Sequence, residues 1–260
     1  DGIASRGLGD VYKRQGYGAT LAILSPFFLE ALRRAGGMGV GILSLPVYAA
    51  IVMSGHQSSA VLALIGLAGW TMLALRNKEV GAKRQVTGFV ISAIIGLLLG
   101  VYLSVVTGQV STLAEAPARY QSFLYQSQLW ELSWQAFMDH WLTGVGMRGF
   151  GTYALATDAS TIPGLAETWH SHLTILEVIS ETGLVGLIGY GLLLRWLWGY
   201  VQDDRMHVAV AGLTALLAVF PLGTAVGMYS YIGGNLIFLT FTLLIALDRD
   251  CPHVTETSAP

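Results

Sequence analysis

The chain has 260 residues, of which 53% are hydrophobic and 12% are charged, against about 25% charged in an ordinary soluble domain. So few charged residues cannot cover a water-facing surface, and we expect lipid to be the main solvent of the chain. The net charge of −2 argues against a nucleic-acid partner, and the single cysteine, Cys251, excludes an internal disulfide.

Residues 1–15 are polar and Gly-rich, and they lack the basic start, apolar middle and cleavage site of a signal peptide. The stretch from Arg6 to Gln15 resembles a translated sequencing adapter. We therefore expect a non-native leader on a chain that is truncated at its N-terminus, with a genuine polar leader as the alternative. Residues 16–249 are the predicted membrane domain, and residues 250–260 are a predicted polar cytoplasmic tail.

Several segments approach the length of about 20 apolar residues that a membrane-spanning helix needs. Pro26 and Glu30 weaken the first of them, and Pro221 interrupts the sixth. The sequence predicts an all-α fold, a polytopic transmembrane bundle of about seven spans with a large extracytoplasmic loop. The predicted spans are 17–32, 38–53, 59–75, 87–106, 173–194, 208–225 and 231–247.

Most basic residues after the leader fall on alternate connections between these spans, which predicts that this side is cytoplasmic. Residues 107–172 therefore form an extracytoplasmic loop, and it carries two cations, Arg119 and Arg148, against the trend. The basic residues on the opposite, cytoplasmic side are Arg33, Arg34, Arg76, Lys78, Lys83, Arg84, Arg195, Arg205 and Arg249.

The loop 107–172 is the longest connection, and connections of this length are functional or disordered. Its many aromatic residues argue against disorder. Apolar residues at three- and four-residue steps over 119–141 predict an amphipathic helix that lies on the outer membrane face or against other helices. Gly144 and Gly146 then predict tight backbone turns with exposed amides that could meet an anion.

Three blocks of sequence resemble the O-antigen ligase family, over about residues 17–248. They are residues 139–150, which read DHWLTGVGMRGF; His170-Ser171-His172 followed by ETGLVG at 181–186; and FPLGT at 220–224. The resemblance implies a bacterial inner-membrane, multi-pass glycosyltransferase with its active site facing the periplasm. It would move a glycan from an undecaprenyl pyrophosphate donor to an acceptor hydroxyl, on lipid A core for a ligase.

Two rival functions remain open beside O-antigen ligation. An O-antigen or polysaccharide polymerase of the same family would use the same chemistry with another acceptor. A transporter of lipid-linked or small solutes would predict a site near the bilayer midplane between internal repeats, and the sequence shows no such repeat. An inactive scaffold is a third possibility.

The implied reaction needs a base that takes the acceptor proton and cations that bind the diphosphate. It needs no cofactor or metal. We expect it to invert the configuration of the anomeric carbon. His172 suits the base, because a neutral imidazole accepts a proton near pH 7. Arg148 and Arg119 suit the pyrophosphate, and a helix starting at His172 would add its positive end. His170, Glu181, Gly144 and Gly146 complete the predicted substrate-binding set.

Each assignment has a structural alternative. His172 could only anchor a helix end, Arg148 could bind loop carbonyls, and Arg119 could be a solvated charge. Glu177 and Glu181 should both face the bundle interior, and for Glu177 we favour a structural role.

The chain also departs from the family pattern at four places, one of which is Trp141, where proline is common. Gln57 and Gln126 stand near places where arginine is common, and Leu173 stands where asparagine is usual. Arg119 or Arg148 would therefore have to supply the missing positive charge.

Overall fold

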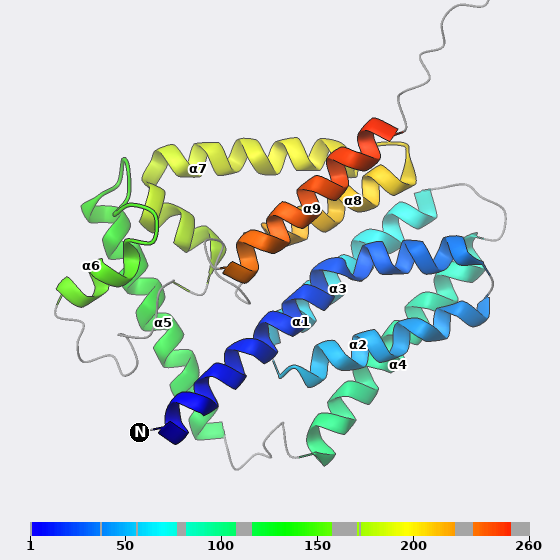
Figure 1. Ribbon diagram of the computed structural model, residues 1–260, viewed down its shortest axis with the longest axis horizontal. Coiled ribbons are helices and arrows are strands. Elements are labelled where there is room, and N and C mark those ends of the chain that lie inside the picture. Colours follow the sequence, from blue (N-terminus) through cyan, green and yellow to red (C-terminus); the bar gives the residue numbers. More distant parts are fainter. Residues whose placement is uncertain are drawn as a thin grey trace, which may run out of the picture.

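The computed structural model describes residues 2–36, 38–55, 57–76, 82–107, 116–157, 171, 173–221 and 231–250. Over this part of the chain it is built of α-helices and one 3-10 helix, with no strand, so the all-α prediction is confirmed. Figure 1 shows these helices packed into one elongated body. They are α1 (Gly2–Ala35), η1 (Met38–Leu43), α2 (Ser44–Met53), α3 (Gln57–Arg76), α4 (Ala82–Val106), α5 (Ala116–Asp139), α6 (Phe150–Ala156), α7 (Thr174–Val201), α8 (Met206–Ala218) and α9 (Tyr231–Asp250).

Each predicted span coincides with a helix, but the number of full-length spans is supported only in part. Among the described residues, α3, α4 and α7 are long and apolar enough to cross a membrane. Two further apolar helices are shorter, Gly41–Met53 and Met206–Ala218. The sixth predicted span, 208–225, is cut short because α8 ends at Ala218, close before Pro221, which cannot donate a helical hydrogen bond.

The first helix starts at Gly2 and therefore continues through the residues predicted to be a leader. The origin of that leader stays a prediction. The predicted tail begins at the last residue of α9, and 251–260 lie outside the described residues.

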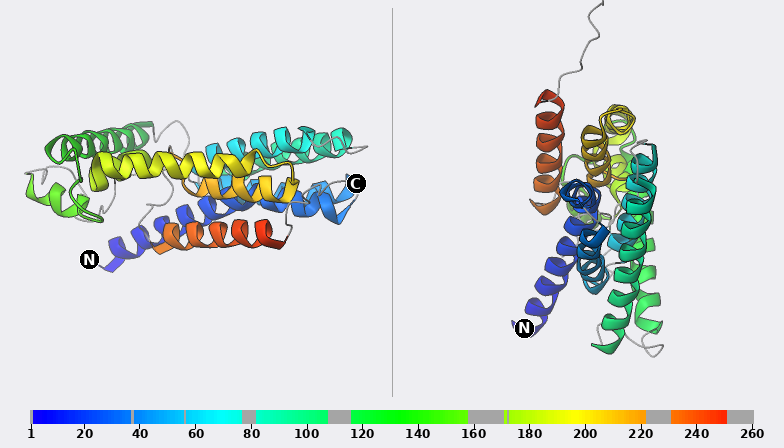
Figure 2. Two further views of the ribbon diagram at one scale, coloured as in Figure 1. Left: turned by 90° about the horizontal axis from the view of Figure 1, so that it is seen from above. Right: turned by 90° about the vertical axis from the view of Figure 1, so that its right-hand side faces the viewer.

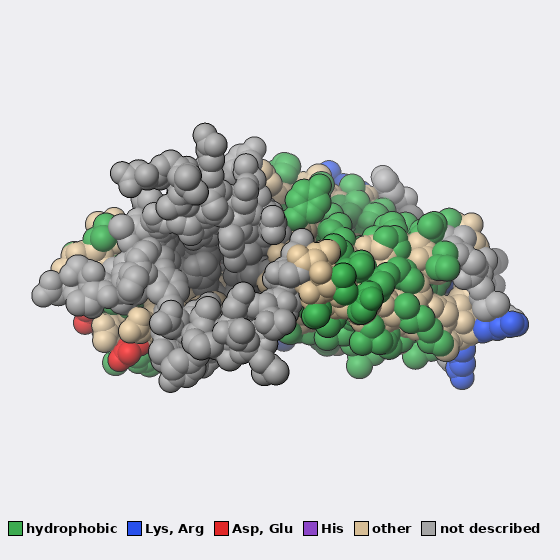
Figure 3. All heavy atoms as spheres, turned by 90° about the horizontal axis from the view of Figure 1, so that it is seen from below, with side chains coloured by type: hydrophobic (Ala, Val, Ile, Leu, Met, Phe, Trp, Pro, Cys, Tyr) green, Lys and Arg blue, Asp and Glu red, His purple; other side chains and the backbone are tan. Residues whose placement is uncertain are grey.

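Basic residues gather toward one end of the molecule. The carboxyl ends of α1, α3, α7 and α9 and the amino ends of α4 and α8 all point to the right-hand end in Figure 1. In the space-filling view, the most prominent Lys and Arg side chains on the drawn face lie at its right-hand end (Figure 3). This is the arrangement expected if these residues share one side of a membrane.

Ion pairs fix the helix ends on this basic side. Arg205 contacts the carboxylates of Asp203 at 2.9 Å and Asp248 at 2.6 Å, and the hydrogen bonds to them raise its pKa. The guanidinium of Arg76 donates to the backbone carbonyls of Gln202 and Asp203. The turn between α7 and α8 is thereby tied to both α3 and α9.

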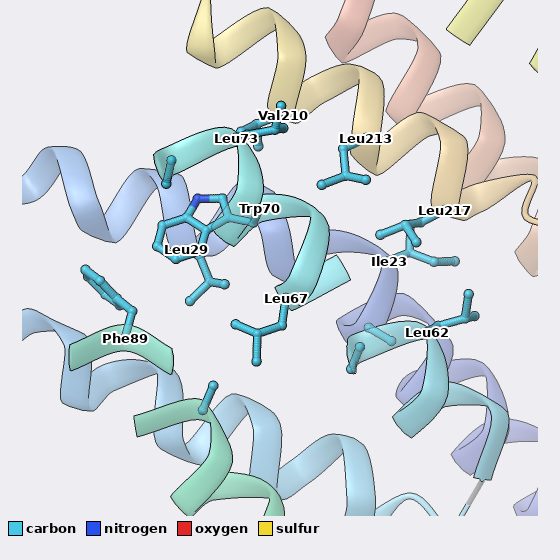
Figure 4. Close-up of a cluster of buried hydrophobic side chains, with 14 of the residues drawn as sticks. Ile23, Leu29, Leu62, Leu67, Trp70, Leu73, Phe89, Val210, Leu213 and Leu217 are labelled. Carbon is cyan, nitrogen blue, oxygen red and sulfur yellow. The ribbon is translucent and has the colours of Figure 1, made fainter. Parts of the chain in front are cut away.

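The main core lies where α1, α3, α4 and α8 meet. Trp70 of α3 is fully buried and packs edge-on against Phe89 of α4, with ring centroids 5.7 Å apart. Figure 4 shows Leu29 of α1 beside Trp70, and Leu213 and Leu217 of α8 close to this cluster. These aromatic and branched side chains come from four helices and hold the basic-end half of the bundle together.

The outward faces of the long helices are apolar. On α4 the exposed side chains include Ile91, Ile95 and Leu98, and on α7 they include Ile188 and Leu192. The described part of the face in Figure 3 is accordingly covered by hydrophobic side chains. A surface of this kind suits lipid and not water, so the structure agrees with a membrane protein.

A smaller unit stands at the opposite end from the basic residues. Figures 1 and 2 show α5 and α6 there, beside the first part of α7. Leu129 and Leu132 of α5 pack against Phe150 and Ala154 of α6 in a separate small core. A helix is therefore present, as α5, where one was predicted over 119–141, and it packs against α6 and α7.

Candidate functional site

The candidate site is built around a break in α7. At Gly183 the backbone leaves the helical conformation, with φ 63° and ψ −156°. In an unbroken helix, the carbonyls of Ser180 and Glu181 would accept hydrogen bonds from amides four residues later. Instead they accept from the loop after α5, from the amides of Val145 at 2.9 Å and Gly146 at 3.0 Å.

The amides on the far side of the break bond to the same loop. The N–H of Leu184 donates to the carbonyl of Trp141 at 2.8 Å, and the N–H of Val185 donates to the carbonyl of Leu142 at 3.2 Å. Two missing helical bonds are thus replaced by four bonds to one loop segment. We call this arrangement, formed by residues 141–146 and 180–185, the splice.

Two glycines make this close approach possible. A Cβ at Gly144 would lie 2.3 Å from the carbonyl carbon of Glu181, and a Cβ at Gly183 would lie 2.5 Å from the carbonyl group of Leu142. Both glycines also have positive φ, at 67° and 63°, where other residues are strained. The backbones of loop and helix therefore touch at positions where only glycine fits.

The structure changes the expected use of the loop amides. The amide of Gly144 donates to the carbonyl of His140 at 2.7 Å, and that of Gly146 donates to Glu181. The expectation that these two amides are exposed for an anion is therefore wrong. Backbone carbonyls that lose their helical partner inside an apolar bundle need another hydrogen-bond donor. Here the loop amides are those donors.

Glu181 contributes its side chain as well as its backbone. The side chain is buried, with 1% of its surface exposed. Its Oε2 accepts the backbone N–H of Arg148 at 2.7 Å, and the backbone amide of Phe150, at the start of α6, also bonds to this carboxylate. Glu177, one turn earlier, is also buried. Both glutamates thus face the interior, as the sequence predicts.

Arg148 occupies an unusual backbone position. Its φ is 58°, and it is the one residue other than glycine with positive φ in the described part of the chain. The turn around it is closed by a bond from the Gly149 N–H to the Gly146 carbonyl at 2.8 Å. Its side chain is exposed, and no described carboxylate forms an ion pair with it. Strain of this kind collects at functional sites.

The support for this loop comes from contacts between α5 and α6. The phenol of Tyr153 donates to Oδ2 of Asp139 at 2.5 Å, and its ring meets His140 edge-on at 6.2 Å between centroids. Burial and the bond to Asp139 raise the pKa of Tyr153 to about 12, so the phenol keeps its proton at neutral pH. Together with the small core of α5 and α6, this bond holds both ends of the loop.

The start of α7 differs from the prediction. The helix begins at Thr174, not at His172, with Leu173 extended at its N-cap. The amide of Ile175 donates to the carbonyl of Pro221 at 3.0 Å, so one amide of the first turn is already bonded. Ser171 is buried, and its hydroxyl donates to the carbonyl of Leu173 at 3.1 Å.

The predicted site residues thus fall into two groups. Arg148, Glu181, Gly144 and Gly146 come together at the splice. His170 and His172 lie outside the described residues. Arg119 is in α5, but its side chain is also outside the description. Their roles stay predictions.

The backbone groups that join the loop to α7 were not among the predicted site residues. Trp141, Leu142 and Ser180 take part through backbone groups, which leave no side-chain signal. Gly183 was the available signal, because a glycine directly after a buried Glu-Thr in an apolar helix marks a place where another backbone can approach. Among the described residues, no three His, Cys, Asp or Glu side chains are grouped as a metal site.

Comparison with known proteins adds the family. The family model described as O-antigen ligase matches residues 41–191. The match covers more than half of the chain and includes the whole splice. No curated protein and no solved structure matches the chain. The match contains the blocks at 139–150 and 170–186, and the block at 220–224 lies outside it. The resemblance is thereby confirmed, and the chain belongs to the O-antigen ligase family.

Proposed function

We propose that this membrane enzyme transfers a glycan from an undecaprenyl pyrophosphate donor to an acceptor hydroxyl at the periplasmic surface of the bacterial inner membrane, as an O-antigen ligase acting on lipid A core. Family membership supports the class of reaction. The observation that carries the site is Arg148, an exposed guanidinium on a strained, anchored backbone outside the predicted spans. A permanently charged, bidentate group suits a diphosphate.

In the proposed reaction, the acceptor oxygen forms a bond to the anomeric carbon of the donor sugar. The bond from that carbon to the phosphate oxygen breaks, and its electron pair leaves with the diphosphate. His172 takes the acceptor proton, and Arg148 stabilises the charge on the leaving group, with Arg119 as a second contact. The attack comes from the side opposite the leaving group, so the anomeric configuration is inverted, and no metal or cofactor takes part.

The part of α7 before its break at Gly183 has two ends, and we assign a different role in the reaction to each. Thr174, two residues after His172 in the sequence, and Glu181, which holds the loop of Arg148, are about 10 Å apart along the helix axis. We therefore place the diphosphate at the Glu181 end and the acceptor hydroxyl at the His172 end, with the transferred sugar between them. The sequence predicts that the positive N-terminal end of this helix binds the diphosphate. In the present proposal that end lies near the acceptor hydroxyl instead.

A reconstituted assay tests this proposal. The purified protein in lipid nanodiscs is given undecaprenyl pyrophosphate-linked glycan with either lipid A core or a second lipid-linked repeat as acceptor. We expect glycosylated lipid A core, release of undecaprenyl pyrophosphate, an inverted anomeric centre and unchanged rates with EDTA. Product only with the second lipid-linked repeat would show a polymerase. Movement of donor across proteoliposomes without any transfer would show a transporter.

A further inference from the structure

We infer that Glu181 is a positioning residue, which holds the loop of Arg148 in place and does not itself touch the substrate. This inference deepens the proposed function and rests on it for the part that concerns the donor. It assigns a different task to Glu181 from the direct substrate contact that the sequence suggested. The task follows from where the carboxylate lies and from what it binds.

Among the described residues, the hydrogen bonds to the carboxylate come from the backbone of one turn. Its Oε2 accepts the Arg148 amide at 2.7 Å, and the Phe150 amide also bonds to it. The amide between them, of Gly149, is used by the Gly146 carbonyl. The Glu181 side chain is 1% exposed, so a substrate could reach it only if this turn opened.

Arg148 offers its amide, and not its guanidinium, to the buried carboxylate. Elsewhere in the chain, buried Glu30 forms ion pairs with the guanidinium groups of Arg33 and Arg34, each at 2.9 Å. At Glu181 the described contact with Arg148 is a hydrogen bond from the backbone N–H, and the arginine side chain is exposed. The anchor thus fixes the backbone and leaves the positive charge free for an anionic ligand.

The anchor also explains how an arginine can hold a positive φ. A left-handed conformation is unfavourable for a residue with a side chain. The hydrogen bond from the Arg148 amide to the buried Glu181 carboxylate opposes this cost. The Glu181 carboxylate can therefore hold Arg148 in a conformation that the loop alone would avoid, and it fixes the loop to the helix that follows His172.

The test combines hydrogen exchange with kinetics on the intact protein in nanodiscs. Glu181→Ala removes both acceptor oxygens, whereas Glu181→Gln keeps one. We expect the amides of residues 148–150 to exchange faster in both variants, more so in Glu181→Ala, with α3 and α4 unchanged. The KM for the donor should rise about tenfold in Glu181→Ala and less in Glu181→Gln, with the KM for the acceptor unchanged.

Two controls separate positioning from general damage. Glu177→Gln removes a neighbouring buried carboxylate and should leave exchange at 148–150 as in the wild type. In an Arg148→Ala background, Glu181→Gln should add no further rise in the donor KM, since the two residues act as one unit.

The outcomes distinguish the inference from the proposed function. Two results would overturn the anchoring role of Glu181. One is an unchanged rate of amide hydrogen exchange at residues 148–150 in Glu181→Gln, and the other is an equal increase of this rate in Glu177→Gln. A further rise in donor KM without Arg148 would also overturn it, because Glu181 would then act on the substrate directly. Faster exchange in a protein whose wild type transfers no glycan would support the anchor and refute the proposed function.

Discussion

At the scale of single residues, Arg148 is where backbone strain and exposed charge coincide. Its φ of 58° would suit glycine better, and glycines stand on both sides of the turn at 146 and 149. An arginine at such a position gives no packing advantage, because its side chain is exposed. The side chain itself must therefore be what the position requires, which favours anion binding over the structural alternative.

Replacing Arg148 with glycine separates function from folding. Arg148→Gly relieves the backbone strain of the folded state, which stabilises it. It also increases the conformational entropy of the unfolded chain, and the two effects on the free energy of unfolding nearly cancel. We expect the free energy of unfolding to stay within about 1 kcal/mol of the wild type, while glycan transfer falls about 100-fold. Thermal unfolding in detergent and transfer rates measure these effects. Full activity in a stable Arg148→Gly protein would show that the guanidinium has no part in the reaction.

At the scale of elements, the splice is what makes loop and helix one unit. Residues 141–146 replace two helical hydrogen bonds of α7 with four, so the loop cannot move away without leaving helical backbone groups unpaired. Unpaired groups in an apolar surrounding are costly. The position of the loop is therefore set by α7, and the arrangement does not depend on loop side chains.

The break in α7 gives a prediction with a matched control. Gly183→Ala would place a Cβ 2.5 Å from the Leu142 carbonyl at a positive φ, so we expect the splice to open at a cost of at least about 2 kcal/mol. Gly189, in the same helix, is exposed with no described atom within 4 Å of its Cβ. Gly189→Ala should leave stability equal or slightly higher. Thermal unfolding of the two variants measures the difference, and equal melting temperatures would refute the splice.

The sequence predicted the helices well and the site only in part. Hydropathy predicted a span wherever the structure has a long apolar helix, because apolar composition is a local property of the sequence. It overestimated the sixth span, since residues 219–225 are apolar but Pro221 lies among them. Gly144, Gly146, Arg148 and Glu181, which the sequence predicted as substrate-binding residues, lie together in the structure, and their role in binding stays a prediction. Their contacts were not predictable, because hydrogen bonds between the backbones of 141–146 and 180–185 leave no trace in residue type beyond the two glycines.

At the scale of the whole molecule, the two ends have different chemistry. One end carries the basic helix termini and the ion pairs around Arg205. The other end carries α5, α6 and the splice (Figure 2). Apolar helix faces lie between them. If the basic end is cytoplasmic, as expected from charge bias, the splice lies at the periplasmic surface, where a lipid-linked donor presents its diphosphate.

Cysteine labelling tests this orientation. Cys251→Ser gives a cysteine-free chain. A single cysteine is then placed at exposed Thr143, within the splice, or at exposed Asp204 between α7 and α8. A membrane-impermeant maleimide applied to spheroplasts should label Thr143→Cys, and it should label Asp204→Cys only after lysis. The reverse pattern would place the splice in the cytoplasm and contradict a periplasmic site.

The most direct test of the central claim is glycan attachment in cells. The gene is expressed in a host that makes lipid-linked O-antigen but lacks its own ligase, and lipopolysaccharide gel profiles are compared for wild type and His172→Ala at matched membrane levels. We predict a ladder of glycan attached to lipid A core for the wild type and none for His172→Ala. A ladder of equal intensity in both, or none from a well-expressed wild type, would contradict an O-antigen ligase that uses His172.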